Sequence, residues 1–270
     1  MSVRSRLAVL TVLAAGTALL LAGGASGAVA PPPANGNFDY QLGGAYTPPD
    51  GTQIVARDRT ESPASGLYNV CYVNAFQTQP DELKFWRKKH PTLLLKRKGR
   101  EVGDPGWPGE VLLDTSSAKR RAGIAKVVNR WIDGCARKGF QAVEPDNLDT
   151  WTRSKSKLSS RDNFALAKKL IAHAHKRGLA IAQKNAAEKT RTGRSLGFDF
   201  AVAESCQVFD ECDAYTGAYG PHVLEVEYSD EGGESNFEAA CQARGGSISI
   251  VYRDHDLVTP GDSDYVNRAC

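Results

Sequence analysis

Short apolar segments that end in polar residues recur along the chain, and they constrain its fold most. Eight of them have the length and composition of strands: Gln53–Ala56, Leu67–Asn74, Glu110–Leu113, Gly139–Val143, Leu179–Gln183, Phe198–Ala203, Val223–Glu227 and Ser247–Tyr252. Helix-like segments lie between several of them, an alternation typical of a parallel sheet. The sequence therefore predicts an α/β protein with a single (β/α)8 TIM-type barrel, in which the polar strand ends form the functional face.

Three intervening segments have clear helix signals. After Ser116 and Ser117, apolar residues from Ile124 to Cys135 recur at helical spacing, and Gly139 follows as a stop. A second helix is expected from near Ser160 to Gly178, and a third from the Ser235–Glu238 capping-box pattern to near Gly245. Each is expected to pack one apolar face on the barrel.

The N-terminus has the pattern of a secretory signal peptide: two arginines, an uncharged run from Leu7 to Leu21, then small residues. The run, about 15 residues, is shorter than the ~20 that a membrane-spanning helix needs. We expect residues 1–28 to be the signal peptide, with cleavage after Ala28, residues 29–37 a proline-containing linker, and residues 38–270 the barrel. The predicted location is secreted or extracellular, without a stable membrane anchor.

All six cysteines lie in the predicted barrel, and an even number in an exported chain favours disulfides. Proximity in the sequence pairs Cys206 with Cys212 and Cys241 with Cys270, which leaves Cys71 with Cys135. Six cysteines permit 15 pairings, so others stay open.

The formal charge of +3 is small and argues against a nucleic-acid partner. The section Arg87–Arg100 is nevertheless densely basic, and Lys96–Arg100 has the character of a hairpin turn. A solvated surface and a rim that contacts an anionic polymer are both open for this section. No feature indicates a stable oligomer, and we expect a monomer.

Two strand ends carry acidic residues suited to catalysis. In Val143-Glu144-Pro145-Asp146, period-two alternation puts Glu144 and Asp146 on one face, and Phe198–Ala203 is followed by Glu204. Glycoside hydrolysis needs two carboxyl groups, one that protonates the leaving oxygen and one that acts as nucleophile or base. Asp146 and Glu204 are therefore the catalytic candidates, although strand-end acids also serve as loop caps and ion-pair partners.

Four fragments carry a resemblance to a known family: Gly106–Glu110, Val143–Asn147 after Gly139-Phe140, Gln183–Asn185, and Ala203–Cys206 with Glu211-Cys212. In these the chain resembles glycoside hydrolase family 114, described as endo-α-1,4-polygalactosaminidases. The resemblance implies a (β/α)8 barrel that cleaves α-linked galactosamine-containing polysaccharide without a cofactor or metal. By similarity to other barrels, Asp146 is expected as nucleophile and Glu204 as general acid/base, in a retaining mechanism.

Other polar residues at the strand ends are expected to bind the polysaccharide, with Lys184 holding Asp146 ionised and aromatic rings stacking on sugars. The predicted substrate-binding residues are Glu144, Asn147, Lys184, Asn185, Glu227, Tyr228, Arg253, Asn74, Asp114 and Trp107. The segment Cys71–Thr78 is bulkier than the small-residue segment of many family members. Together with the basic section, it makes a neutral N-acetylated or an anionic α-linked glycan as reasonable a substrate as polygalactosamine.

Two other classes of function stay open at this point. A secreted barrel that binds glycan without cutting it does not need both Asp146 and Glu204. A metal-dependent hydrolase or deacetylase has little support, since Asp254-His255-Asp256 is the one local ligand cluster and no His-Glu-x-x-His pattern occurs.

Overall fold

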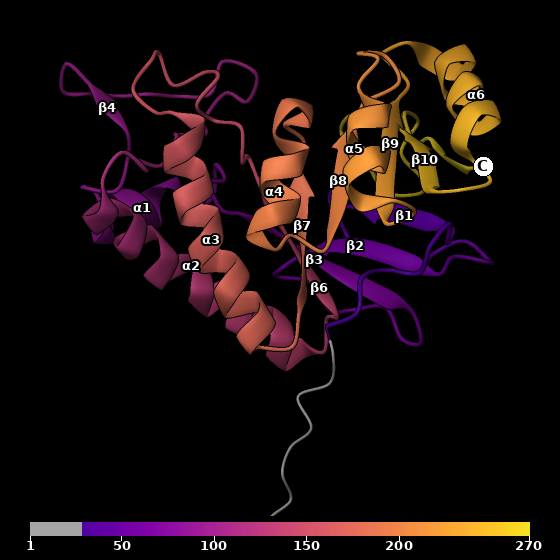
Figure 1. Cartoon of the computed structure of the whole chain (residues 1–270), viewed down its shortest axis with the longest axis horizontal. Coiled ribbons are helices and arrows are strands. Elements are labelled where there is room, and N and C mark those ends of the chain that lie inside the picture. The colour runs from indigo at the N-terminus through magenta and orange to yellow at the C-terminus, as the bar shows by residue number, and fades with distance from the viewer. Residues whose placement is uncertain (1–28) are drawn as a thin grey trace, which may run out of the picture.

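Eight parallel strands form a nearly closed barrel in the computed structural model, which describes residues 29–270 (Figure 1). The strands are β1 (Phe38–Gln41), β2 (Ile54–Asp58), β3 (Tyr68–Asn74), β6 (Ala142–Asp146), β7 (Ala180–Lys184), β8 (Phe200–Glu204), β9 (Val223–Tyr228) and β10 (Ser249–Arg253). They lie side by side in chain order, and β1 returns to the neighbourhood of β10. A ninth strand, β11 (Asn267–Ala269), pairs antiparallel with β10. The (β/α)8 prediction is confirmed, while the predicted signal peptide lies outside the described residues.

Seven of the predicted strands are present, but one prediction was wrong and one strand was missed. Glu110–Leu113 forms only isolated antiparallel bridges, to Gln77, Leu94 and Gly103, because it belongs to a long excursion after β3. The missed strand is β1, whose alternate residues Asp39 and Gln41 are polar. Both are buried and hydrogen-bonded, Asp39 to Tyr46 and Gln41 to Arg57. The acid-ended strand β6 is still the fourth barrel strand.

The excursion between β3 and β6 contains most of the structure outside the barrel repeat. It holds α1 (Leu83–Lys89), the hairpin of β4 (Lys96–Arg97) and β5 (Arg100–Glu101), and the long α2 (Ala118–Lys138). Ser117 caps α2 by accepting from the Arg120 amide, and Gly139, with φ 94°, ends it. Ser159 and Asp162 form the capping box of α3 (Ser160–Lys176), which packs beside α2.

The later crossovers are shorter. They comprise the 3-10 turn η1 (Ala187–Lys189) with α4 (Thr190–Leu196), then α5 (Cys212–Tyr219), then α6 (Gly233–Arg244). Among the described residues, none of the helices is both long and apolar enough to cross a membrane.

Strand alternation divides the apolar residues into two cores. Residues such as Ala142, Ala182, Val202 and Val226 point into the barrel, whereas their neighbours pack against the helices. On β6 the inward series continues from Ala142 through Glu144 to Asp146. The same parity brings Lys184 and Glu204 inward at the carboxyl ends of β7 and β8.

Three disulfides join Cys71 with Cys135, Cys206 with Cys212 and Cys241 with Cys270, the pairs expected from the sequence. The first ties β3 to α2, and the third ties α6 to the chain end just after β11.

Candidate active site

A cleft of about 590 Å³ opens at the carboxyl ends of the barrel strands. Of the predicted site residues, Asp146, Asn147, Lys184, Asn185, Glu204, Tyr228 and Trp107 line it. They come from strand ends and from the excursion between β3 and β6, so the cleft combines the barrel mouth with one inserted wall.

Three neighbouring strands end on an ionisable residue of this cleft. Asp146 is the last residue of β6, Lys184 of β7 and Glu204 of β8. In each case the next residue has a left-handed backbone: Asn147 at φ 66°, Asn185 at φ 50° and Ser205 at φ 53°. A left-handed residue at this point turns the chain sharply away, and such conformations outside glycine gather at functional sites. The three charged side chains are thereby left facing one space.

The ammonium group of Lys184 lies between the carboxylates. Its Nζ is 3.3 Å from Asp146 Oδ1, 3.2 Å from Glu204 Oε1 and 3.0 Å from Glu144 Oε1. Burial disfavours the charged amine, but Asp146, Glu204 and Glu144 outweigh it and raise the pKa of Lys184 well above its ordinary value. Lys184 is therefore a permanent cation that holds both candidate catalytic carboxyl groups.

Asp146 is stabilised as a carboxylate. Burial raises its pKa, but the charge of Lys184 and hydrogen bonds from Tyr72 and the Asn147 backbone outweigh burial, so that the pKa is lowered. The Tyr72 hydroxyl donates to Asp146 Oδ2 over 2.7 Å. An ionised carboxylate held in this way is suited to act as a nucleophile.

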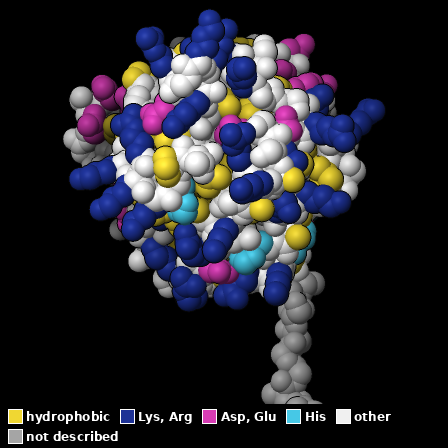
Figure 2. All heavy atoms as spheres, turned by 90° about the vertical axis from the view of Figure 1, so that its left-hand side faces the viewer, with side chains coloured by type: hydrophobic (Ala, Val, Ile, Leu, Met, Phe, Trp, Pro, Cys, Tyr) yellow, Lys and Arg dark blue, Asp and Glu magenta, His cyan; other side chains and the backbone are white. Residues whose placement is uncertain are grey.

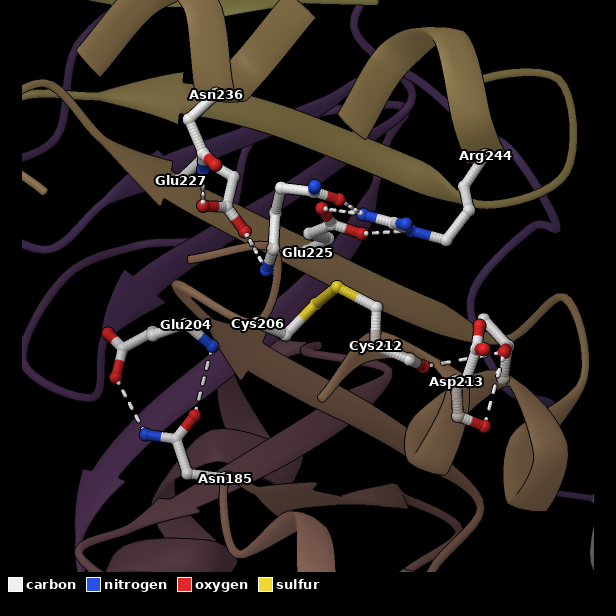
Figure 3. The surroundings of a disulfide bond; sticks show 11 residues. Asn185, Glu204, Cys206, Cys212, Asp213, Glu225, Glu227, Asn236 and Arg244 are labelled. Atoms are coloured by element: carbon white, nitrogen blue, oxygen red, sulfur yellow. Dashed lines mark hydrogen bonds and ion pairs between the residues drawn. A yellow bond between two sulfur atoms is a disulfide. The ribbon is translucent and has the colours of Figure 1, made fainter. Parts of the chain in front are cut away.

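Glu204 is positioned by side chains from both neighbouring strands. Asn185 Nδ2 donates to Glu204 Oε2 over 2.9 Å, while Asn185 Oδ1 accepts from the Glu204 amide over 2.9 Å (Figure 3). On the other side, the Tyr228 hydroxyl donates to Glu204 Oε1 over 2.7 Å. The carboxyl side chain is 26% exposed, which leaves it open to the cleft.

The floor beneath these groups is a second ionisable layer. Glu144 is fully buried, and its Oε1 accepts from the Tyr40 hydroxyl over 2.6 Å as well as from Lys184. Its Oε2 has no hydrogen-bond partner. Burial raises the pKa of Glu144 in spite of Lys184. Glu144 is therefore placed to support Lys184 from below, out of reach of a substrate in the cleft.

The outer wall of the cleft is acidic and aromatic. Beyond the central groups it is lined by one arginine, Arg153, and by the acids Asp58, Asp104, Glu110, Asp149, Glu231 and Asp256. Arg153 is paired with Asp104 and Asp149. Trp107 is 49% exposed and Phe209 60% exposed, and these rings offer apolar faces at the rim. The basic section 87–100 contributes no residue to the lining.

Besides Glu144, four predicted binding residues lie outside the cleft lining. Glu227 is next to the inward Tyr228, so alternation turns it outward, where it accepts from the Gln207 amide and from Asn236 (Figure 3). Arg253 is buried at the seam of the barrel, where it donates to the Tyr40 and Val266 carbonyl oxygens. Asp114 accepts from Ser116 before α2. Asn74 is buried and donates to Glu110 while accepting from Asn147.

Several lining residues escaped the sequence-based prediction. Tyr72 is not among the predicted binding residues, and Tyr40 lies on the missed strand. Glu110, Gln77 and Arg153 belong to loops whose course the sequence does not define. Inward alternation from Asn74 and Asp146 would have found Tyr72, because Tyr72 pairs in register with Glu144.

The Cys206–Cys212 disulfide lies beside Glu225 and Glu227, and these four residues are close enough to resemble a metal-ligand group (Figure 3). Its sulfur atoms are covalently joined, so they are not available as thiolate ligands. Glu225 is instead paired with Arg244.

A parallel barrel with two carboxyl groups across its mouth has the arrangement that glycoside hydrolysis requires. The sequence matches the glycoside hydrolase family GH114 model over residues 20–270, and the chain belongs to this family. No curated protein matches the sequence.

Solved structures with the same fold include the following two. Ega3 of Aspergillus fumigatus, crystallised in complex with galactosamine, is 22% identical and superposes with a TM-score of 0.71 over 90% of this chain and 98% of its own. The glycoside hydrolase domain of PelA from Pseudomonas aeruginosa is 14% identical, with a TM-score of 0.57 over 84% of this chain and 98% of its own.

Proposed function

We propose that this glycoside hydrolase cleaves α-linked polysaccharide containing galactosamine or N-acetylgalactosamine, with retention of configuration at the anomeric carbon. The observation that carries the proposal is the shared contact of Asp146 and Glu204 with Lys184. Asp146 is the proposed nucleophile and Glu204 the proposed general acid/base.

The shared lysine limits how far apart the two carboxyl groups can be. Asp146 Oδ1 and Glu204 Oε1 each lie within 3.3 Å of one nitrogen atom, so at most about twice that distance separates them. Retaining glycosidases have carboxyl groups about 5 to 5.5 Å apart, whereas inverting enzymes leave about 6.5 to 9.5 Å for a water molecule. The compact arrangement supports retention.

The surroundings of the two acids support the division of roles. Asp146 has a lowered pKa and three stabilising partners, which suits attack on the anomeric carbon as a carboxylate. Glu204 is the more exposed of the two, at 26% against 17%, and Asn185 and Tyr228 hold its oxygens. From there it can give a proton to the leaving oxygen and later take one from water.

The charge of the cleft favours a cationic sugar. Asp58, Glu110, Glu231 and Asp256 add negative charge around the central groups, and the basic section lies elsewhere. Ionised galactosamine carries an ammonium group, which such a cleft attracts. The galactosamine bound in Ega3 is consistent with this choice. A polymer with free amines is thus favoured over a neutral or an anionic glycan, and we propose that the enzyme meets it outside the cell, as three disulfides suggest.

The test is reducing-end release from galactosaminogalactan, with the anomer of the first product followed by NMR. We expect α-configured product from the wild type and losses of at least about a thousandfold in Asp146→Ala and Glu204→Ala. Azide should rescue Glu204→Ala with formation of the α-glycosyl azide, and Asp146→Ala with formation of the β-glycosyl azide. Product of β configuration from the wild type would refute retention, and exchanged azide products would reverse the two roles.

A further inference from the structure

Charge is strongly segregated on the surface. Between residues 82 and 178, every exposed charged side chain is a lysine or arginine, and each acid in this range is buried or half-buried. The side of the molecule formed by α1, α2, α3 and the β4–β5 hairpin is accordingly covered with basic side chains (Figure 2). We define the basic face as the exposed Lys and Arg residues of α2 and α3 together with Arg177, which directly follows α3: Lys119, Arg120, Lys126, Arg130, Arg137, Lys138, Arg161, Lys168, Lys169, Lys176 and Arg177.

The basic face has linear order. On α2, Lys119, Lys126, Arg130 and Arg137 are spaced by seven, four and seven residues, which places them along one side of the helix. At 1.5 Å per residue this row is about 27 Å long. The exposed basic residues of α3 lie alongside this row, because two ion pairs hold α3 next to α2. Arg121 of α2 pairs with Asp162 of α3, and Asp133 of α2 pairs with Arg177 directly after α3.

Much of this charge is not neutralised by the protein. Among the described residues, Lys126, Arg130, Lys168 and Lys169 make no ion pair. They lie at similar heights on the two helices, midway between the Arg121–Asp162 and Asp133–Arg177 contacts. An unneutralised double row of cations is a surface that attracts an extended polyanion.

The side chains present select among polyanions. Neither α2 nor α3 exposes a large hydrophobic residue, since the described exposed ones are Phe85, Trp107, Val208 and Phe209. The face therefore lacks the aromatic rings on which single-stranded nucleic acids stack and the apolar residues that enter a membrane interface. It offers charge alone, which suits carboxylate or sulfate groups along a flexible chain.

We propose that the basic face binds a linear acidic polysaccharide, independently of the cleft. The two surfaces carry opposite charge: the cleft is lined mainly by acids, and none of the basic-face residues lines it. A polyanion held on α2 and α3 does not occupy the catalytic groups. The enzyme is thus anchored on one polymer while its cleft acts on another.

Binding is tested directly, with no activity measurement, so that its failure is separate from failure of the proposed function. The probe is a heparin fragment of defined length, titrated against the folded protein at low and at physiological salt. The variant Lys126→Gln/Arg130→Gln/Lys168→Gln/Lys169→Gln is expected to bind about tenfold more weakly at low salt, and binding of the wild type should weaken as salt is added. The matched control Lys189→Gln/Arg191→Gln/Arg194→Gln/Arg268→Gln removes the same charge outside the basic face and should bind as the wild type does.

Equal losses of heparin affinity in the two quadruple variants would overturn the proposal, because the net charge of the protein alone would then explain binding. Absence of heparin binding by the wild type at low salt would also overturn it. Tighter binding to a single-stranded DNA oligonucleotide of equal charge, or to vesicles of anionic lipid, would assign the face to another partner. Circular dichroism and thermal melting of both variants ensure that the comparison is between folded proteins.

Discussion

The Tyr40 hydroxyl donates a hydrogen bond of 2.6 Å to Glu144 Oε1 beneath the catalytic cleft. Tyr40 also accepts from Lys184 over 3.0 Å. The first barrel strand is thereby connected to the centre of the site, although the groups that face the substrate come from the fourth to the sixth. Four ionisable side chains contact the ammonium group of Lys184, namely those of Tyr40, Glu144, Asp146 and Glu204. The charge of Lys184 is therefore the first property to test.

Replacement of Lys184 by methionine is expected to reduce kcat/KM by about 100- to 1000-fold, because it removes the cation between Asp146 and Glu204. It should also raise the pKa of Asp146, since burial would no longer be opposed by this charge. The acidic limb of the pH–rate profile should then move to higher pH. Lys189→Met, outside the cleft, is the control. An acidic limb at its wild-type position in Lys184→Met would contradict this account of Asp146.

The two tyrosines that donate to the proposed catalytic acids, Asp146 and Glu204, should be separable by kinetics. A hydrogen bond to a charged group contributes about 1.5–3 kcal/mol, so Tyr72→Phe and Tyr228→Phe should each lose about tenfold to a hundredfold in kcat/KM. Only Tyr72→Phe should shift the acidic limb upward, because Tyr72 helps to lower the pKa of Asp146. Tyr68→Phe, whose hydroxyl donates to the Ala30 carbonyl, should leave both quantities unchanged. A shift of the acidic limb of the pH–rate profile in Tyr228→Phe but not in Tyr72→Phe would reverse the roles proposed for Asp146 and Glu204.

The fold itself was largely predictable, because a strand buried on both faces leaves an apolar segment that ends in polar residues. Such segments identified seven of the eight barrel strands. Phe38–Gln41 failed this criterion because Asp39 and Gln41 are buried through hydrogen bonds, which the sequence does not reveal. Glu110–Leu113 met the criterion because its apolar residues are buried within the inserted segment itself.

The site was predictable where it depends on strand parity. Asp146, Lys184 and Glu204 were found at strand ends, and the structure brings them together. Parity also turns Tyr228 into the barrel and Glu227 out of it, a distinction that the prediction of substrate-binding residues did not use. The inserted wall with Glu110, and the loop after β6 with Arg153, depend on loop conformation, for which the sequence provides no periodic signal.

Glu227 should make stability depend on pH. Burial, and next the proximity of Glu225, raise the pKa of Glu227 to about 8 against a hydrogen bond from the Gln207 amide. The folded protein therefore binds a proton that the unfolded chain, with an ordinary value of 4.5, has already lost. Stability from this group is present below pH 4.5 and is lost as pH rises to about 8. The melting temperature of the wild type should fall across this window more steeply than that of Glu227→Gln. Parallel melting curves against pH would contradict the raised pKa.

The short and the long disulfide should differ in what their removal affects. Cys206–Cys212 closes a six-residue separation directly after Glu204, and Cys241–Cys270 closes one of 29 residues. Chain entropy predicts losses of about 2 and about 3.6 kcal/mol in unfolding free energy, respectively. We expect Cys206→Ala/Cys212→Ala to lose more activity per unit of stability, because the loop next to Glu204 is freed. Denaturant unfolding and kcat/KM measured on both double variants check this, and equal activity losses would contradict it.

The seam between the first and last parallel strands has a consequence for self-association. No backbone ladder joins β1 to β10, and a side chain takes its place: Arg253 of β10 donates to the Tyr40 carbonyl of β1. Next to it, Asn267 of β11 donates to Asp39 of β1 over 2.8 Å. Unpaired strand edges are templates for intermolecular pairing and fibril growth. Here the two edges of the barrel sheet lie close together, and Arg253 and Asn267 bridge them within the molecule, so the seam between β1 and β10 is not open to strand pairing with a neighbouring molecule.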